Sequence, residues 1–133
     1  MSESVSAETV RIPALRVLMM PHDTNPHGTI FGGTILGYID QAAAAATRDY
    51  PPYRFVTASM ERIDFERPVF VGDLLSFYTR VLKVGRTSMR IEVSVEARRF
   101  SNPEVTEAIA RTELVYVAID EDRRPTPIGK PVG

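Results

Sequence analysis

The clearest pattern in the chain is a strict alternation of apolar and polar side chains within residues 87–100. A period of two residues is typical of a strand that buries one face and exposes the other to water. Residues 74–83 are also rich in apolar side chains, and Val84-Gly85-Arg86 between the two segments favours a turn. We therefore predict an antiparallel hairpin. The buried face of its second strand comprises Met89, Ile91, Val93, Val95 and Ala97.

Two more apolar segments, near the two ends of the chain, are also expected to be strands. Residues 10–20 form the first, with Pro13 near its beginning or at a sheet edge, where a missing N–H is tolerated. Residues 105–119 form the last strand and are rich in Val, Ile, Leu and Tyr, which favour strands.

A further strand is expected over residues 54–65, where the alternation is interrupted. Apolar side chains alternate as far as Met60 and then change phase at Ile63. One extra residue in a strand produces such a shift, so we predict a β-bulge around Glu61-Arg62.

The segment that Gly32-Gly33 opens is predicted to form a helix that ends near Tyr50. Gly32-Gly33 allows a sharp turn into it, and the two prolines at 51–52 end it. Its interior is apolar or small nearly all round, so we expect the rest of the protein to wrap it. Antiparallel strands can bury such a helix only if their sheet curls round it. The prediction is an α+β hotdog fold, an antiparallel sheet wrapped around one long central helix.

Asp40 is the only formal charge between residues 34 and 46 of this helix. It shares a helix face with Gly33, Gly37 and Ala44, and no Lys or Arg lies within a turn of it. An unpaired carboxylate loses several kcal/mol on leaving water, so an acid in this position is either paired or used in chemistry. A partly exposed acid, or one with a structural hydrogen bond, is the alternative interpretation.

The helix start offers a second chemical feature, because the N–H groups of Gly32 and Gly33 carry no side chain that would cover them. Such groups bind an anion or an oxyanion. They precede Asp40 by seven or eight residues, about 10 Å along a helix axis, which is too far to reach one carbonyl carbon. Two chains with antiparallel helices about a twofold axis would close this gap, so we predict an obligate dimer with two shared sites.

Length and composition narrow the possibilities further. The 133 residues suit one domain, and a net charge of −1 gives no reason to expect nucleic acid or an anionic membrane as a partner. Without cysteine, and with two histidines, no metal site is expected. Residues 1–9 lack the features of a signal peptide, and no apolar stretch approaches a membrane span, so we expect a cytoplasmic protein. Flexible ends are expected at about residues 1–9 and 120–133.

Several spaced motifs resemble those of hotdog-fold acyl-CoA thioesterases, in the small single-domain bacterial branch. They are Met-Pro-His-Asp-Thr-Asn-Pro-His-Gly at 20–28, Ile-Phe-Gly-Gly at 30–33, Asp40, Arg67-Pro68, Val-Gly-Asp at 71–73 and the segment 83–88. The resemblance implies hydrolysis of acyl-CoA thioesters at a dimer interface, often within a hexamer built as a trimer of dimers. No cofactor is implied, since coenzyme A is part of the substrate.

The resemblance also assigns roles to single residues. Asp40 would activate water or attack the thioester carbonyl, and the Gly32 N–H would polarise that carbonyl. Asn25 would position the nucleophile or the substrate, although an Asn before Pro is by itself more often a turn residue. Phe31 and Gly33 would contact the substrate beside them. The hairpin that would lie near the pantetheine and phosphates of coenzyme A comprises Lys83, Val84, Gly85, Arg86, Thr87 and Ser88.

Two other functions fit the residues less well than a hydrolase does. A hotdog hydratase or dehydratase usually pairs a histidine with its acid, but Phe31 stands immediately before Gly32. A non-catalytic acyl-CoA sensor normally carries a DNA-binding segment, for which this chain has neither room nor charge. Residues that depart from the family pattern, such as Thr29 and Thr34, leave the acyl-chain preference open.

Overall fold

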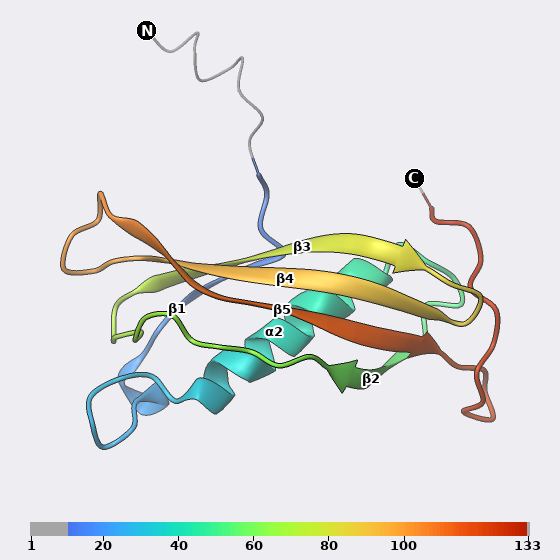
Figure 1. Ribbon diagram of the computed structural model, residues 1–133, viewed down its shortest axis with the longest axis horizontal. Coiled ribbons are helices and arrows are strands. Elements are labelled where there is room, and N and C mark those ends of the chain that lie inside the picture. The colour runs from blue at the N-terminus through green and yellow to red at the C-terminus, as the bar shows by residue number, and fades with distance from the viewer. Residues whose placement is uncertain (1–10, 133) are drawn as a thin grey trace, which may run out of the picture.

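The computed structural model describes residues 11–132, which form a curved sheet packed on one α-helix (Figure 1). The predicted helix and every predicted strand are present, with shorter bounds for some of them. In chain order the elements are β1 (Leu15–Leu18), the short 3-10 helix η1 (Pro21–Asp23), α2 (Gly32–Thr47), β2 (Phe55–Met60), β3 (Leu74–Val84), β4 (Ser88–Arg98) and β5 (Thr106–Ala118).

The five strands form one antiparallel sheet in the order β1-β3-β4-β5-β2. The predicted hairpin is the β3–β4 pair, in which Leu75 lies opposite Ala97 and Val84 opposite Met89. The shorter strands β1 and β2 are the two edges. The sheet curls over α2, which crosses its concave side (Figure 1).

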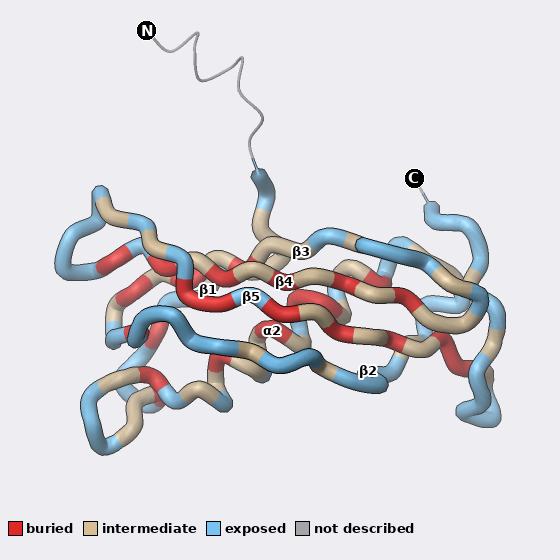
Figure 2. The backbone as a smooth tube through the Cα atoms, viewed as in Figure 1, coloured by how far each residue is buried: buried red, intermediate tan, exposed pale blue. Residues whose placement is uncertain are grey.

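The alternation in the sequence places the core between the sheet and the helix. In β4 the odd-numbered residues from Met89 to Ala97 are buried, and the even-numbered residues between them are partly exposed on the outer face (Figure 2). The helix meets this apolar surface with Ile35 and Ile39 and with the small side chains of Ala42 and Ala43, all of them buried. Small residues on the helix allow the sheet to approach it closely.

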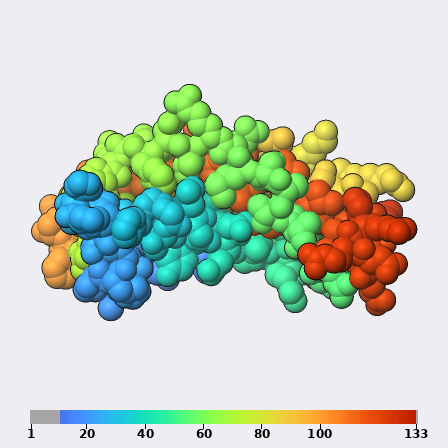
Figure 3. Space-filling model, turned by 90° about the horizontal axis from the view of Figure 1, so that it is seen from below, coloured from blue at the N-terminus to red at the C-terminus, as the bar shows by residue number. Residues whose placement is uncertain are grey.

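The predicted complete wrapping of the helix is wrong for the single chain. Gly33, Gly37, Gln41 and Ala45, four residues apart, form an exposed stripe along α2. In the view from below, the cyan helix lies uncovered between the loop that precedes it and the green segment containing β2 (Figure 3). A five-stranded sheet curls over one side of a helix only, so this stripe of α2 stays uncovered in the single chain.

The β-bulge lies in the predicted strand but not at the predicted place. The register of β2 on β5 shifts between Thr57 and Ser59, and the strand ends at Met60. The prediction of a bulge around Glu61-Arg62 is therefore wrong. The change of phase after Met60 marks the point where the chain leaves the strand, which apolar spacing alone does not distinguish from an inserted residue.

Residues 120–132, where the sequence predicts a tail, pack against the end of the molecule that holds the β3–β4 turn (Figure 1). The Ile128 N–H donates to the Arg86 carbonyl at 2.8 Å, and the Gly129 N–H donates to the Pro51 carbonyl at 2.9 Å. The expected flexible start at residues 1–9 lies outside the described residues. Across residues 11–132, no helix is long and apolar enough to cross a membrane.

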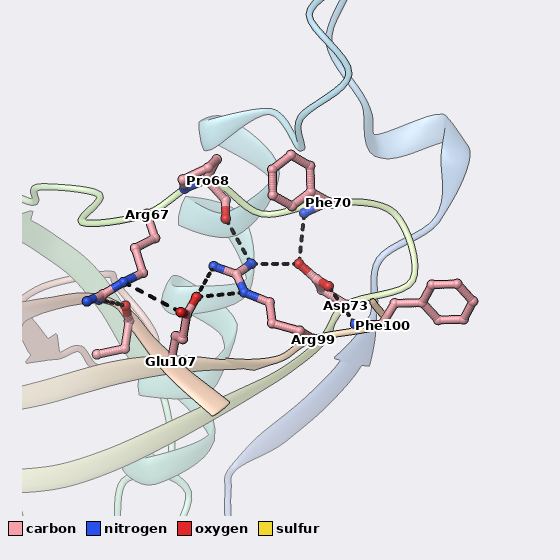
Figure 4. A network of polar contacts seen from close by, with 8 residues as sticks. Arg67, Pro68, Phe70, Asp73, Arg99, Phe100 and Glu107 are labelled. Carbon is pink, nitrogen blue, oxygen red and sulfur yellow. Dashed lines mark hydrogen bonds and ion pairs between the residues drawn. The ribbon is translucent and has the colours of Figure 1, made fainter. Parts of the chain in front are cut away.

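A buried ion-pair network fixes the end of the sheet where β3 begins and β4 ends (Figure 4). Arg99 donates from Nη1 to Asp73 Oδ2 at 2.8 Å and from Nη2 to Glu107 Oε2 at 2.7 Å. The Asp73 carboxylate also accepts the backbone N–H groups of Phe70 and Phe100, both at 2.9 Å. Each charge is paired and hydrogen-bonded, so the network is a structural element that holds the loop before β3.

Candidate active site

The carboxylate of Asp40 projects from the middle of α2 toward strands β2 and β5. Its Oδ1 accepts a hydrogen bond from Thr57 Oγ1 at 2.8 Å and is also in hydrogen-bond contact with the Tyr116 hydroxyl. No Lys, Arg or His of the described chain pairs with this half-buried acid, and Oδ2 has no hydrogen-bond partner there. In the single chain Asp40 therefore matches the alternative interpretation from the sequence, a partly exposed acid with structural hydrogen bonds. It is not paired with a cation there, and its second carboxylate oxygen is left for another ligand.

The two hydroxyl groups come from facing positions on neighbouring strands. Thr57 in β2 lies opposite Tyr116 in β5, and both side chains reach the helix from the sheet. Burial raises the pKa of the Tyr116 hydroxyl, and its hydrogen bond to the Asp40 carboxylate raises it further. The phenol therefore stays protonated at neutral pH. Nothing in the sequence singles out Thr57 or Tyr116, because only the register of β2 on β5 brings them together.

The start of α2 presents two backbone donors. The N–H groups of Thr34 and Ile35 are directed to the Phe31 carbonyl at 3.1 and 3.5 Å, whereas those of Gly32 and Gly33 have no acceptor in the part of the chain described here. Unpaired N–H groups at a helix start favour an anionic or partly negative ligand. The exposed Phe31 directly precedes Gly32 in the sequence, and the ring of the exposed Phe65 lies close to Gly32 in space.

The donors at the helix start and the Asp40 carboxylate do not meet within one chain. Gly32 and Asp40 are eight residues apart in one continuous helix, which corresponds to about 12 Å along the helix axis. A thioester carbonyl cannot contact both groups of the same chain. The structure therefore agrees with the spacing argument made from the sequence.

Asn25 is part of the loop that leads into α2. Its Oδ1 accepts the backbone N–H groups of His27 at 2.8 Å and Thr29 at 3.2 Å, and its Nδ2 donates to Thr29 Oγ1 at 2.8 Å. These bonds shape a tight loop in which Gly28 has φ +88°. Asn25 makes no hydrogen bond to Asp40 within residues 11–132. In one chain it has the turn role that residue type alone suggests.

The β3–β4 hairpin presents two exposed cations, Lys83 and Arg86. Neither forms a salt bridge within the described residues, which leaves both free to meet an anion. Lys83, Gly85 and Ser88 contribute to a concavity of about 260 Å³ on the outer face of the sheet. The hairpin turn and the start of α2 lie at opposite ends of the molecule (Figure 1). Within a single chain, the exposed cations of the hairpin are therefore far from the unpaired N–H groups at the start of α2.

Comparison with known proteins identifies the relatives of this chain. Residues 27–99 match the family model described as the thioesterase superfamily. An uncharacterised acyl-CoA thioester hydrolase of Zymomonas mobilis is 48% identical over 113 residues, covering 85% of this chain and 75% of the relative.

Solved structures agree with this match. A hexameric hotdog-fold thioesterase of Campylobacter jejuni shares 43% identity with a TM-score of 0.80, over 88% of this chain and 90% of that one. An acyl-CoA hydrolase of Staphylococcus aureus, solved with butyryl coenzyme A, shares 31% identity with a TM-score of 0.78, over 90% of this chain and 71% of that one. A variant of that enzyme with an aspartate replaced by alanine matches with a TM-score of 0.76. The predicted hotdog fold is thereby confirmed.

Proposed function

The chain belongs to the thioesterase superfamily as an acyl-CoA thioester hydrolase, and from that premise we propose that Asp40 drives hydrolysis at a site shared by two copies. The observation that carries the proposal is the state of the Asp40 carboxylate. Neutral hydroxyl groups hold its Oδ1, no cation of the described chain neutralises it, and its Oδ2 is unpaired.

The chemistry needs a base or a nucleophile and a donor for the developing oxyanion. As a base, Asp40 takes a proton from water while the oxygen of that water adds to the thioester carbonyl. As a nucleophile, Asp40 adds directly and forms an anhydride that water then hydrolyses. In both routes the Gly32 N–H of a second copy stabilises the oxyanion. The carbon–sulfur bond then breaks, and coenzyme A leaves as a thiolate that is protonated.

A second copy would supply the missing half of each site. The exposed stripe of Gly33, Gly37, Gln41 and Ala45 adjoins the edge strand β2, so a broad surface of small side chains lies open on one side (Figure 3). If the helices of two copies run antiparallel there, each Asp40 approaches the other chain's helix start. The Campylobacter jejuni relative is hexameric, and we propose a trimer of such dimers for this protein.

The substrate would extend from this shared site to the hairpin. Phe31 and Gly33 would contact the acyl group or the pantetheine beside the reacting carbonyl. The exposed Lys83 and Arg86 would meet the phosphates of coenzyme A, and Gly85 and Ser88 line the adjoining concavity. Asn25 would help to position substrate by the amide hydrogen that its loop leaves unused.

The test is release of free coenzyme A from a panel of acyl-CoA esters, followed with a thiol-reactive colour reagent. We expect turnover of short- and medium-chain esters without added metal, and full activity after treatment with a chelator. Absence of thiol release from every ester of the panel would contradict the proposed function.

A further inference from the structure

Tyr116 is a buried residue of β5 whose hydroxyl contacts the Asp40 residue of the helix. Its side chain is part of the core, and 2% of its surface is exposed. The hydroxyl lies 2.7 Å from the backbone carbonyl oxygen of Asp40 and makes a short contact with Asp40 Oδ1. The phenol therefore reaches both the backbone and the side chain of one residue, from the sheet side.

These two contacts restrict the conformation of Asp40. The phenol has one proton to donate, and both acceptors lie within its reach only when the Asp40 side chain folds back toward its own carbonyl. Other staggered rotamers of Asp40 would move Oδ1 away from that point. The hydroxyl of Thr57 contacts the same Oδ1, which leaves the unpaired Oδ2 on the opposite side of the carboxylate.

We propose that Tyr116 is a positioning residue that holds Asp40 in the one rotamer that presents Oδ2 to the thioester or its attacking water. The proposal rests on the role of Asp40 under the proposed function. Because the phenol is buried, Tyr116 does not touch substrate and acts only through Asp40. Its raised pKa, caused by burial and then by the Asp40 hydrogen bond, keeps the proton in place throughout the neutral range.

Removal of one oxygen atom tests the proposal. Tyr116→Phe keeps the ring in the core and deletes the donor, so we expect kcat to fall about ten- to hundredfold while KM changes less than about twofold. Tyr78→Phe is the matched control. That tyrosine lies on the outer face of β3 with the Arg11 guanidinium 3.8 Å over its ring, and its variant should retain wild-type kcat.

A double-variant cycle with Asp40→Asn tests the positioning role of Tyr116 separately from the catalytic role of Asp40. If Tyr116 acts through Asp40, Tyr116→Phe should not lower the residual kcat of Asp40→Asn any further. Losses that multiply would show that Tyr116 acts independently and would overturn the positioning role. Full activity of Tyr116→Phe beside an inactive Asp40→Asn would overturn it as well, and would leave the role of Asp40 intact. Near-normal activity of Asp40→Asn would instead remove the proposed function itself.

The fold of each variant is checked by circular dichroism and by its oligomeric mass. Should Tyr116→Phe assemble poorly, Tyr116→Met provides a second side chain without a donor, since methionine adapts to irregular core spaces. The same loss of kcat at unchanged KM is expected. A folded Tyr116→Met with wild-type kcat would contradict the proposal equally well.

Discussion

Thr57 and Tyr116 face each other across β2 and β5, and the hydroxyl groups of both contact the same oxygen of Asp40. This arrangement makes the two oxygens of one carboxylate inequivalent. Oδ1 is fixed to the sheet, while Oδ2 faces away from these donors without a partner in the described structure. Two neutral donors hold this helix acid in position without an ion pair, which suits a base or a nucleophile.

Replacing the Asp40 carboxylate by an amide should abolish turnover without disturbing the fold. Asp40→Asn keeps the shape of the side chain and can still accept hydrogen bonds at one oxygen, but it is neither a base nor a nucleophile. We expect kcat to fall by orders of magnitude while substrate affinity changes little. Steady-state kinetics with one medium-chain acyl-CoA give both values. Turnover near the wild-type rate would exclude Asp40 from the chemistry.

Neutralising the hairpin cations should weaken recognition of the nucleotide part of the substrate. Lys83→Ala and Arg86→Ala each remove an exposed charge that no carboxylate of the described chain pairs with. We expect KM to rise far more for acyl-CoA than for an acyl-pantetheine, which lacks the nucleotide phosphates.

Arg80→Ala is the matched control for these variants. Arg80 lies on the same strand as Lys83 but is paired with Glu92 at 3.3 Å. Its removal should affect both substrates equally and weakly. Equal increases in KM for acyl-CoA and acyl-pantetheine in Lys83→Ala or Arg86→Ala would assign these cations to the structure of the hairpin.

Breaking the buried network at the end of the sheet should destabilise the protein without a specific effect on chemistry. Arg99→Ala leaves Asp73 buried without its cation, and such a loss costs about 3 to 5 kcal/mol of the unfolding free energy. Arg62→Ala removes an exposed pair with Asp64 and should change that free energy by less than about 1 kcal/mol. Denaturant unfolding at one fixed protein concentration measures both. Comparable losses for the two variants would contradict the structural importance of the Arg99 network.

The alternation of apolar and polar residues predicted much of this fold. It did so because each strand of the hairpin buries one face against the helix and exposes the other. The alternation from Met89 to Ala97 identified β4 and its inward side, and Gly32 and Pro51 bracketed α2. The exposed stripe of Gly33, Gly37, Gln41 and Ala45 was not predicted, because small and apolar residues indicate burial of a helix without showing which positions the sheet reaches. The sequence showed that Gly32 and Asp40 are too far apart along one helix to reach the same carbonyl. It did not show which strand residues surround either of them.

The sequence identified only those parts of the candidate site whose residue types are unusual for their position in the chain. Asp40 was identified as an isolated acid on an apolar helix, and the helix-start glycines as bare donors. Thr57 and Tyr116 are ordinary strand residues in the sequence, and their meeting at Asp40 depends on the register of β2 on β5, in which Thr57 lies opposite Tyr116. Long-range register of this kind is not visible in local periodicity.

The shared site can be tested with two inactive variants that repair each other. Asp40→Asn lacks the carboxylate, and Gly32→Pro lacks the oxyanion donor. Gly32 is the first residue of α2, a position that favours proline, so the helix should persist. Gly32→Ala is the matched control, because its Cβ meets the Phe65 ring at 3.3 Å as a proline Cβ would, while its N–H remains. We expect that control to be active.

The most direct measurement is the activity of Asp40→Asn and Gly32→Pro after they are unfolded and refolded together in equal amounts. Each mixed dimer would hold one site with both lesions and one with neither, and random pairing makes half of the dimers mixed. Activity should therefore recover to about a quarter of that of wild type treated in the same way. Circular dichroism and oligomeric mass establish that the mixture has refolded. If properly folded mixed dimers show no activity above that of the two variants alone, each site lies within one chain and the shared site is contradicted.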